Sequence, residues 1–465
     1  MRAMKTDIMV VIALCAAALK GAEVVVDASC ELGPVKPVNG VGQPPILGWS
    51  NMSMFHYLKE AGIPYSRLHD VGGAFGKNVY VDIPNLFRDF DADENDPASY
   101  DFAFTDLLMK ALVDNGVEPY FRLGVTIENS HHVKAYRIFP PKDYAKWARI
   151  CEHVVRHYTE GWADGFKMNV SHWEIWNEPE NYETIEKNQM WKAPFSEYVR
   201  LYVVAAKHLK GCFPHLKIGG YASCGFYGVS SCWAKPNKDP RIPFLHESFT
   251  NFLAGVRDAK APLDFFSFHC YDRPVHAVSQ IAYCRRTLDD FGFANTEMSL
   301  NEWMPCAGGP RRNEDATPRQ TAEIAAMLCA MQNGPVDDAE IYDAKCGAGV
   351  YSPFFDVKTH KPKPAYYVYL AFNELRKLGR AVKVSVMGDG VDRMFAVAAR
   401  GAGGGLAALV VNCADEPTPV SISGGVGSPR CRIIDDAHVY EEVPLPSALP
   451  SNAVLLVEWP KQSMK

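Results

Sequence analysis

The chain has 465 residues, of which 48% are hydrophobic and 12% aromatic, and its formal net charge at pH 7 is -6. This length suits a barrel of roughly 250 residues or more with an accessory domain, and the hydrophobic content excludes a disordered chain. Acidic and basic residues are scattered, and no cluster of lysine and arginine has the density of a nucleic-acid-binding face, so we expect no nucleic-acid partner.

The first 21 residues have the features of an export signal. Arg2 and Lys5 precede an apolar run from Ile8 to Leu19, which is too short to span a bilayer. A buried first strand is the alternative for this segment, but residues 23–28 already supply one. We therefore expect a secreted or periplasmic protein whose mature chain does not insert into a membrane.

Between residues 30 and 378, short β-rich runs alternate with longer helical runs. The clearest predicted helices cover residues 52–61, 104–115, 141–158 and 196–212. The predicted strands cover residues 35–41, 65–69, 118–123, 170–176, 217–221, 264–269, 297–301 and 338–342. Eight strands with helical crossovers predict an α/β fold, the (β/α)₈ TIM barrel, although their order alone leaves an open doubly wound sheet as an alternative.

The character of the chain changes after Pro364. A helix at residues 365–378 closes the barrel, and short β-type segments separated by turn signals follow it. These segments cover residues 381–386, 393–399, 406–412, 419–422 and 454–458. They predict a C-terminal β-sandwich accessory domain at residues 379–465, which the strand at 22–29 is expected to join.

Neither the cysteines nor the histidines predict a metal site or a cofactor. Thirteen cysteines sit at irregular spacings without a C-x-x-C pair, which argues against a zinc ribbon. Their odd number leaves at least one unpaired, and the pairing of the others stays open. His153 and His157 have the i,i+4 spacing of metal ligands, but no adjacent glutamate completes His-Glu-x-x-His, so we interpret them as helix-face residues.

Two glutamates stand where an active site is expected. Glu178 lies at the tip of the strand in the sequence WEIWNEP, residues 173–179, and Glu302 at the tip of the strand in MSLNEW, residues 298–303. Active sites of such barrels form at the carboxyl ends of the strands, and these would be strands four and seven, on facing sides of the mouth. Retaining glycoside cleavage needs one carboxylic acid to protonate the departing oxygen and a carboxylate about 5 Å away to attack the anomeric carbon. The charge of the attacking group is expected to raise the pKa of its partner.

Asn177-Glu178-Pro179 after an aromatic-rich strand, together with the later Glu302, resembles clan A of the glycoside hydrolases. Within the clan the chain most resembles family 39, the β-xylosidase and α-L-iduronidase family. The resemblance extends over the barrel and the trailing β-sandwich, and it includes the segments Arg67-Leu-His69, His157-Tyr-Thr-Glu-Gly-Trp162 and Ser267-Phe-His-Cys-Tyr271. It implies a double-displacement mechanism on an oligosaccharide or glycoside substrate without a cofactor.

The resemblance also implies the roles of individual residues. Glu178 would be the acid/base and Glu302 the nucleophile. Asn177 would hydrogen-bond the sugar 2-hydroxyl, and Arg67 would keep the nucleophile ionised. Tyr271 would donate a hydrogen bond to the nucleophile.

Three further residues would shape the pocket. His69 and His269 would line the site of the cleaved sugar, and Trp303 would form an apolar wall under its ring. The alternative for each of these side chains is ordinary core packing. Glu174, four residues before the acid/base on the same strand, is interpreted as a buried hydrogen-bonding partner.

The chain departs from the family pattern after His69, where typical members carry a glycine and this sequence has Asp70-Val-Gly-Gly73. An aspartate facing the sugar would repel a uronic acid, which weighs against an α-L-iduronidase. Glu128 and Asp343 are less favoured candidates for contacts with substrate.

We therefore expect a β-xylosidase-like activity, with an α-L-iduronidase, another β-glycosidase or an arabinosidase as alternatives. A catalytically inactive carbohydrate-binding barrel and a metal-dependent barrel hydrolase are the competing classes. The sequence leaves the sugar, its linkage and the oligomeric state open.

Overall fold

The computed structural model describes residues 21–73, 79–127, 138–236, 238–306, 308–309, 316–389 and 391–459. Apart from Gly21, the predicted export signal at residues 1–21 lies outside the described residues, and so does Glu128. In the described part of the chain, no helix combines the length and the apolar character that crossing a membrane requires.

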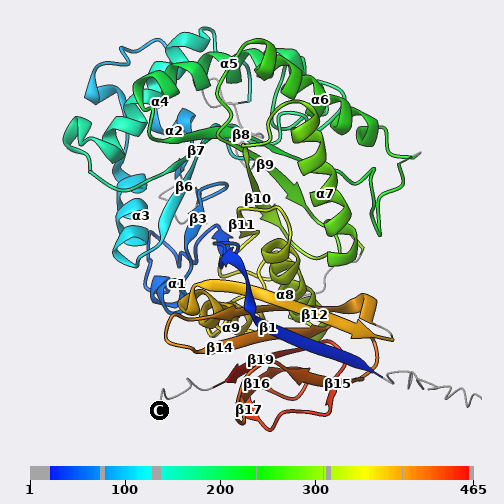
Figure 1. Cartoon of the computed structure of the whole chain (residues 1–465). Helices are drawn as coiled ribbons and strands as arrows, with labels where there is room; N and C mark the ends of the chain where they lie inside the picture. The colour runs from blue at the N-terminus through cyan, green and yellow to red at the C-terminus, as the bar shows by residue number, and fades with distance from the viewer. Residues whose placement is uncertain are drawn as a thin grey trace, which may run out of the picture.

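Eight parallel strands close a barrel, which confirms the predicted fold class (Figure 1). The barrel strands, in chain order, are β2 (Gly40–Gly42), β3 (Tyr65–Arg67), β6 (Glu118–Leu123), β7 (His172–Ile175), β8 (Lys217–Ser223), β9 (Phe265–Cys270), β10 (Glu297–Trp303) and β11 (Asp338–Ile341). Pairing of β11 with β2 closes the ring and rules out the open sheet. The first strand is shorter than predicted, because residues 35–39 precede the ladder.

Helices surround the barrel, and α2 and the two-stranded sheet of β4 and β5 belong to the insertion after β3 (Figure 1). The helices are α1 (Phe55–Glu60), α2 (Ile83–Leu86), α3 (Ala103–Asp114), α4 (Tyr144–Thr159), α5 (Phe195–Cys212), α6 (Arg241–Asp258), α7 (Pro274–Asp290), α8 (Pro318–Asn333) and α9 (Pro364–Leu378). The two short strands are β4 (Gly72–Gly73) and β5 (Val79–Tyr80).

Helix α4 shows why such a segment is helical. The Asp143 side chain accepts hydrogen bonds from the backbone N–H groups of Ala145 and Lys146 and so caps the first turn. The buried residues Trp147 and Cys151 recur at helical spacing and face the barrel.

A second, mostly antiparallel sheet of nine strands packs below the barrel in Figure 1. Its strands are β1 (Ala22–Pro34), β12 (Arg380–Gly388), β13 (Met394–Arg400), β14 (Leu406–Asn412), β15 (Thr418–Ser423), β16 (Arg430–Ile434), β17 (Val439–Val443), β18 (Ala448–Leu449) and β19 (Ala453–Trp459). The N-terminal β1 lies between β12 and β15, so the two ends of the described chain share one sheet.

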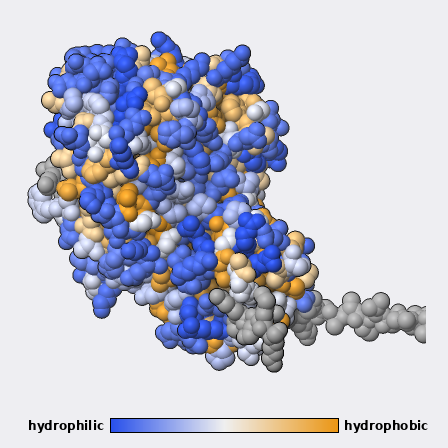
Figure 2. Space-filling view, turned by 60° about the vertical axis from the view of Figure 1, so that its left-hand side comes forward, coloured by the Kyte–Doolittle hydropathy of each residue, from blue (hydrophilic) through white to orange (hydrophobic). Residues whose placement is uncertain are grey.

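Strand alternation gives this sheet two buried faces. On β13, Val397 and Ala399 join the core of the barrel and its helices, whereas Ala396 and Ala398 join a second core within the C-terminal domain. Helices α8 and α9 contact the sheet on the first face. On the molecular face shown in Figure 2, hydrophobic side chains are scattered among hydrophilic ones. The cysteines of the described residues are free thiols.

Candidate active site

A cavity of about 300 Å³ opens among the loops that follow the barrel strands. Its lining side chains come from several strand ends and from the start of α6. They are His69, Asp70, Ile127, Asn177, Glu178, Asn181, Cys224, Tyr227, Trp233, Arg241, Ile242, Leu245, Tyr271, Glu302, Tyr342 and Tyr351. Five of the eight predicted site residues are among them, and the other three, Arg67, His269 and Trp303, are buried.

Glu178 reaches the cavity through a sharp turn after β7. Its φ of +43° lies in the left-handed region, which a side-chain-bearing residue rarely adopts and which marks a functional turn. The Glu178 backbone N–H donates to the carbonyl of Ala222 at 3.0 Å, which ties the turn to β8. The Asn181 amide donates to Glu178 Oε2 at 2.7 Å and orients the carboxyl group.

Glu302 lies near the end of β10 and is almost completely buried. Arg67 Nη1 donates to Glu302 Oε2 at 3.0 Å, and the Tyr271 hydroxyl donates to Glu302 Oε1. A buried carboxylate needs such partners to remain charged. The two contacts therefore fix the orientation of the Glu302 carboxyl group.

The two glutamates lie close together across the mouth. An oxygen of Glu178, a ring nitrogen of His269 and an oxygen of Glu302 all lie within 4.8 Å of one another. Retaining glycosidases separate their carboxyl groups by about 5–5.5 Å, whereas inverting ones leave about 6.5–9.5 Å for a water molecule. The geometry is that of the retaining class.

His269 bridges the two carboxyl groups rather than lining the cavity. Its Nδ1 lies 2.9 Å from Glu178 Oε1, and its Nε2 lies 3.6 Å from Glu302 Oε2. Burial alone would raise the pKa of Glu178, but the hydrogen bond and charge of His269 outweigh it and bring that pKa below its ordinary value. Burial likewise opposes the charged His269, but Glu302 and Glu178 together raise the pKa of His269.

The expected rise in the pKa of Glu178 is therefore wrong for the free protein. Repulsion between the two glutamates alone would raise the pKa of Glu178, but the imidazole of His269 between them lowers it. Both shifts favour a charged Glu178 beside a charged His269 in the free protein.

Arg67 organises the floor of the site. Besides Glu302, its guanidinium donates to Glu174 Oε2 at 2.9 Å and to Asn177 Oδ1 at 2.7 Å. Burial would lower the pKa of Arg67, but Glu174 and Glu302 raise it. Glu174 also accepts from Ser267 at 2.6 Å, so the prediction that it is a buried hydrogen-bonding partner is confirmed.

Asp70 faces the cavity and is itself hydrogen-bonded. Its Oδ1 accepts from the Ile127 N–H and its Oδ2 from the Tyr342 hydroxyl, each at 3.1 Å. His69 Nε2 lies 3.3 Å from Asp70 Oδ2. Burial, with the positive charges of Arg122 and Arg67, holds the pKa of His69 well below its ordinary value, so this imidazole is neutral.

Several lining residues were not predicted from the sequence. Asn181 stands three residues after Glu178, and this spacing is the one local signal that points to it. Trp233, whose indole N–H donates to the Tyr271 carbonyl at 2.7 Å, follows a loop that carries no motif. Tyr342 and Tyr351 contact the ring of Tyr271 edge-on, which no local pattern reveals.

Trp303 and Asp343, like Arg67 and His269, are not among the residues that line the cavity. Trp303 ends β10 and is fully buried, and its role as a wall under the sugar stays a prediction. Asp343 follows β11, is fully buried and lies 3.4 Å from the ammonium group of Lys345.

The donor atoms of Glu178, His269 and Glu302 are close enough for a metal ion. Their charges are already compensated, since Arg67 contacts Glu302 and the imidazole is bonded to Glu178. The cluster is therefore better suited to moving a proton than to holding a cation.

Comparison with known proteins agrees with this geometry. The family model described as "Glycosyl hydrolases family 39" matches residues 49–296. Over 205 residues, 42% of this chain, the sequence is 28% identical to a β-xylosidase of Geobacillus stearothermophilus and covers 35% of that relative, so the chain spans about a third of the relative's length.

The overall structure is similar to solved structures over nearly its whole length. A glucosidase from Croceicoccus marinus matches with a TM-score of 0.71 and 22% identity over 94% of this chain and 98% of that chain. A monomeric β-xylosidase from Caulobacter crescentus CB15 matches with a TM-score of 0.67 and 16% identity over 95% and 100%. These matches show a shared fold.

Proposed function

The chain belongs to glycosyl hydrolase family 39, and on this premise we propose that it is a retaining glycosidase of β-xylosidase-like specificity that removes terminal sugars. The observation that carries the proposal is the close approach of Glu178 and Glu302, within 4.8 Å. The similarity to a β-xylosidase supports the sugar class.

In the first step, a Glu302 oxygen attacks the anomeric carbon while the bond to the departing oxygen breaks. The departing oxygen takes a proton from Glu178, which draws it from the imidazolium of His269, 2.9 Å away. Asn177, held by Arg67, is positioned to accept from the sugar 2-hydroxyl through the transition state.

In the second step, the glycosyl ester on Glu302 is hydrolysed. The pair of Glu178 and His269 gave up its proton in the first step, and ester formation removes the negative charge of Glu302, which lowers the pKa of the pair. Glu178 is therefore ionised and can act as a base. Glu178 takes a proton from a water molecule, whose oxygen attacks the anomeric carbon and releases Glu302.

The charges of the cavity favour a neutral sugar. Asp70 and Glu302 both face it. Among the described arginines at the cavity, Arg67 is shared among Glu302, Glu174 and Asn177. Arg241, which also lines the cavity, is paired with Asp239 at 2.8 Å. A uronic acid would be repelled, so we propose a neutral glycoside rather than an iduronide.

The test is a panel of nitrophenyl glycosides that includes β-xyloside, β-glucoside, α-arabinoside and α-iduronide. Turnover of a neutral member is expected in the wild type and is expected to be lost in Glu302→Ala. NMR spectroscopy of the first-formed sugar should show retention at the anomeric carbon. Product of inverted configuration, or turnover of the iduronide alone, would contradict the proposal.

We also propose export of the protein, which the basic and apolar character of residues 2–19 supports. The N-terminal residue of the protein recovered outside the cytoplasm of an expressing cell tests this, since cleavage is expected near residue 21.

A further inference from the structure

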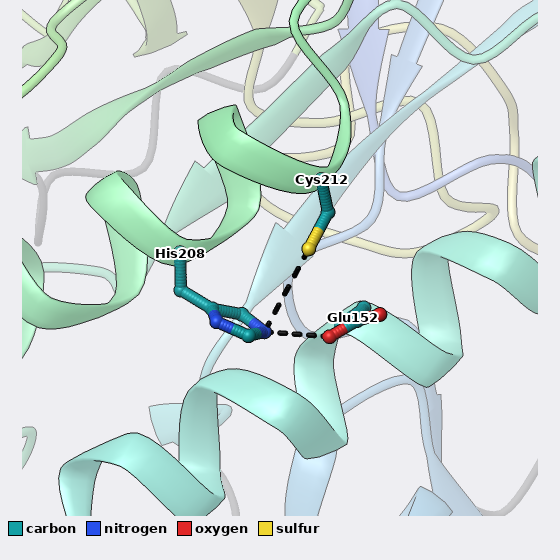
Figure 3. A group of neighbouring side chains, drawn as sticks. All are labelled: Glu152, His208 and Cys212. Atoms are coloured by element: carbon teal, nitrogen blue, oxygen red, sulfur yellow. Dashed lines mark hydrogen bonds and ion pairs between the residues drawn. The ribbon is translucent and has the colours of Figure 1, made fainter.

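Helices α4 and α5 carry three side chains of metal-ligating type on their facing sides (Figure 3). Glu152 lies on α4, and His208 and Cys212 lie on α5. His208 Nε2 lies 2.6 Å from Glu152 Oε2 and 3.9 Å from Cys212 Sγ. One donor atom from each residue lies within 4.8 Å of both others.

The sequence of α5 brings two of these ligands onto one face. His208 and Cys212 are four residues apart, so their side chains are one turn apart on the same side of the helix. They occupy the last turns of an 18-residue helix, where the carbonyl groups give the helix end a partial negative charge. This end of a helix favours a bound cation.

Arg156 is the charged neighbour that must be accounted for. Its Nε donates to Glu152 Oε1 at 2.8 Å, which leaves Glu152 Oε2 directed at His208. Arg156 also ion-pairs with Glu160, so its charge is shared between two carboxylates. A hydrogen bond to the non-ligating oxygen is the kind of outer contact that orients a ligating carboxylate.

We propose that Glu152, His208 and Cys212 form a binding site for a transition-metal ion of the zinc class, with solvent in the fourth position. The nitrogen and sulfur ligands favour such an ion over calcium or magnesium, which prefer oxygen. Side-chain exposures of 32% for His208 and 14% for Glu152 leave the site reachable from solvent.

Binding is a ligand exchange that balances in protons. The Cys212 thiol releases its proton to solvent and becomes a thiolate ligand. The proton held between His208 Nε2 and Glu152 Oε2 also leaves, to Nδ1 from a neutral imidazole or to solvent from an imidazolium, and two bonds to the metal replace that hydrogen bond. Ligand atoms around a tetrahedral zinc ion lie about 3.3 Å apart for bonds of about 2.0 Å, so the 2.6 Å contact must widen slightly. The partly exposed side chains allow this movement.

The position of the site indicates a structural role. The end of α5 at Cys212 lies next to the start of β8 at Lys217, whereas Glu178 and Glu302 lie at the opposite, carboxyl ends of the barrel strands. A metal ion here would join α4 to α5 and stabilise the native state without touching the substrate.

Another buried cluster, His172, Glu297 and Asp338, is a weaker candidate. The Lys217 ammonium group already lies 2.7 Å from Glu297 Oε2 and supplies the positive charge there. The spacing of residues in the sequence does not reveal the site between α4 and α5, because Glu152 is far in sequence from His208 and Cys212.

The experiment measures the binding of Zn²⁺ alone to the full-length, untagged chain by equilibrium dialysis, with Co²⁺ as a spectroscopic probe. One zinc ion per chain is expected in the wild type, with a cobalt–thiolate charge-transfer band for Co²⁺. Cys212→Ser and His208→Gln should each weaken zinc binding at least about tenfold. The matched control is Cys30→Ser, a partly exposed thiol on β1 in the other domain, which should bind as the wild type does.

Circular dichroism establishes that each variant is folded, and Zn²⁺ should raise the melting temperature of the wild type but not of Cys212→Ser. Absence of stoichiometric zinc in the wild type would overturn the proposal. So would unchanged zinc affinity in folded Cys212→Ser, or cobalt bound without the thiolate band.

Discussion

At the scale of single residues, the site is organised by contacts that compensate buried charge. Arg67 donates hydrogen bonds to Glu302, Glu174 and Asn177. His269 contacts both Glu178 and Glu302. Each of these buried charges therefore has an opposite charge or a donor beside it, as burial in a low dielectric requires.

Replacing Glu178 with alanine should affect substrates according to their leaving groups. A natural glycoside needs protonation of its departing oxygen, whereas a nitrophenolate departs readily without it. We expect kcat on natural oligosaccharides to fall roughly 100-fold or more, with a much smaller loss in the first step on nitrophenyl substrates. Steady-state and burst kinetics on both substrates check this, and equal losses would count against Glu178 as the acid.

Glu180 makes the stability of the protein depend on pH. Burial raises its pKa to about 8, above the value of an exposed glutamate, so the folded protein binds a proton that the unfolded chain releases. Its contribution to stability is fully present below the unfolded pKa and is lost as the pH rises towards 8.

Glu180→Gln keeps the acceptor for the Cys224 N–H, which lies 2.8 Å from Glu180 Oε1, but cannot ionise. Between the unfolded and folded pKa values of Glu180, the wild type should lose stability as the pH rises and the variant should not. We expect the difference in their free energies of unfolding to change by up to about 1.4 kcal/mol per pH unit. Urea unfolding at pH 5 and pH 8 measures this, and parallel losses in both proteins would refute a protonated Glu180.

At the scale of elements, close strand packing explains why β8 contains glycine. A Cβ at Gly219 would lie 2.2 Å from the carbonyl oxygen of Phe265, the residue of β9 with which Gly219 pairs. Because this oxygen belongs to the backbone and not to a flexible side chain, it cannot move away, and the added Cβ would force the two strands apart.

Gly219→Ala should therefore destabilise the protein by about 1–3 kcal/mol, and by more if the barrel cannot adjust. Gly211→Ala is the matched control, since a Cβ there meets nothing within 4 Å and lies on helix α5. That control should be neutral or stabilising by about 0.5–1 kcal/mol. Denaturant unfolding compares the pair, and similar stabilities for both variants would show that β8 tolerates a side chain at this position.

At the scale of the whole molecule, the barrel and the nine-stranded sheet share one core. Val397 and Leu409 of the sheet belong to the same buried cluster as the barrel helices, and α8 and α9 lie at the junction. The N-terminal β1 completes the sheet, so the barrel lies in sequence between two parts of the domain that supports it.

We expect the two domains to unfold in one cooperative transition, because separating them would expose this shared apolar surface. Scanning calorimetry should give a van't Hoff enthalpy close to the calorimetric one. Two resolved transitions would show that the domains are independent. A chain ending at Gly379 should aggregate or lose stability, since α8 and α9 would lose their cover.

Local sequence patterns were sufficient to predict much of the fold. Strand β6 was predicted at its observed bounds, because its residues form a buried run between a helix stop and a loop. Strand β17 was missed, because most of its residues are exposed and present no alternating apolar pattern.

Local sequence features predicted the eight strands and the two candidate glutamates, because strand periodicity and the position of a residue at a strand end are local properties. The three-dimensional structure was needed to show that β11 pairs with β2 and closes the barrel, and that β1 pairs with β12. It was also needed to show that His269 lies between Glu178 and Glu302 and lowers the pKa of Glu178. These facts depend on distances between residues remote in the chain, and electrostatic effects change sign with whichever group the fold brings nearest.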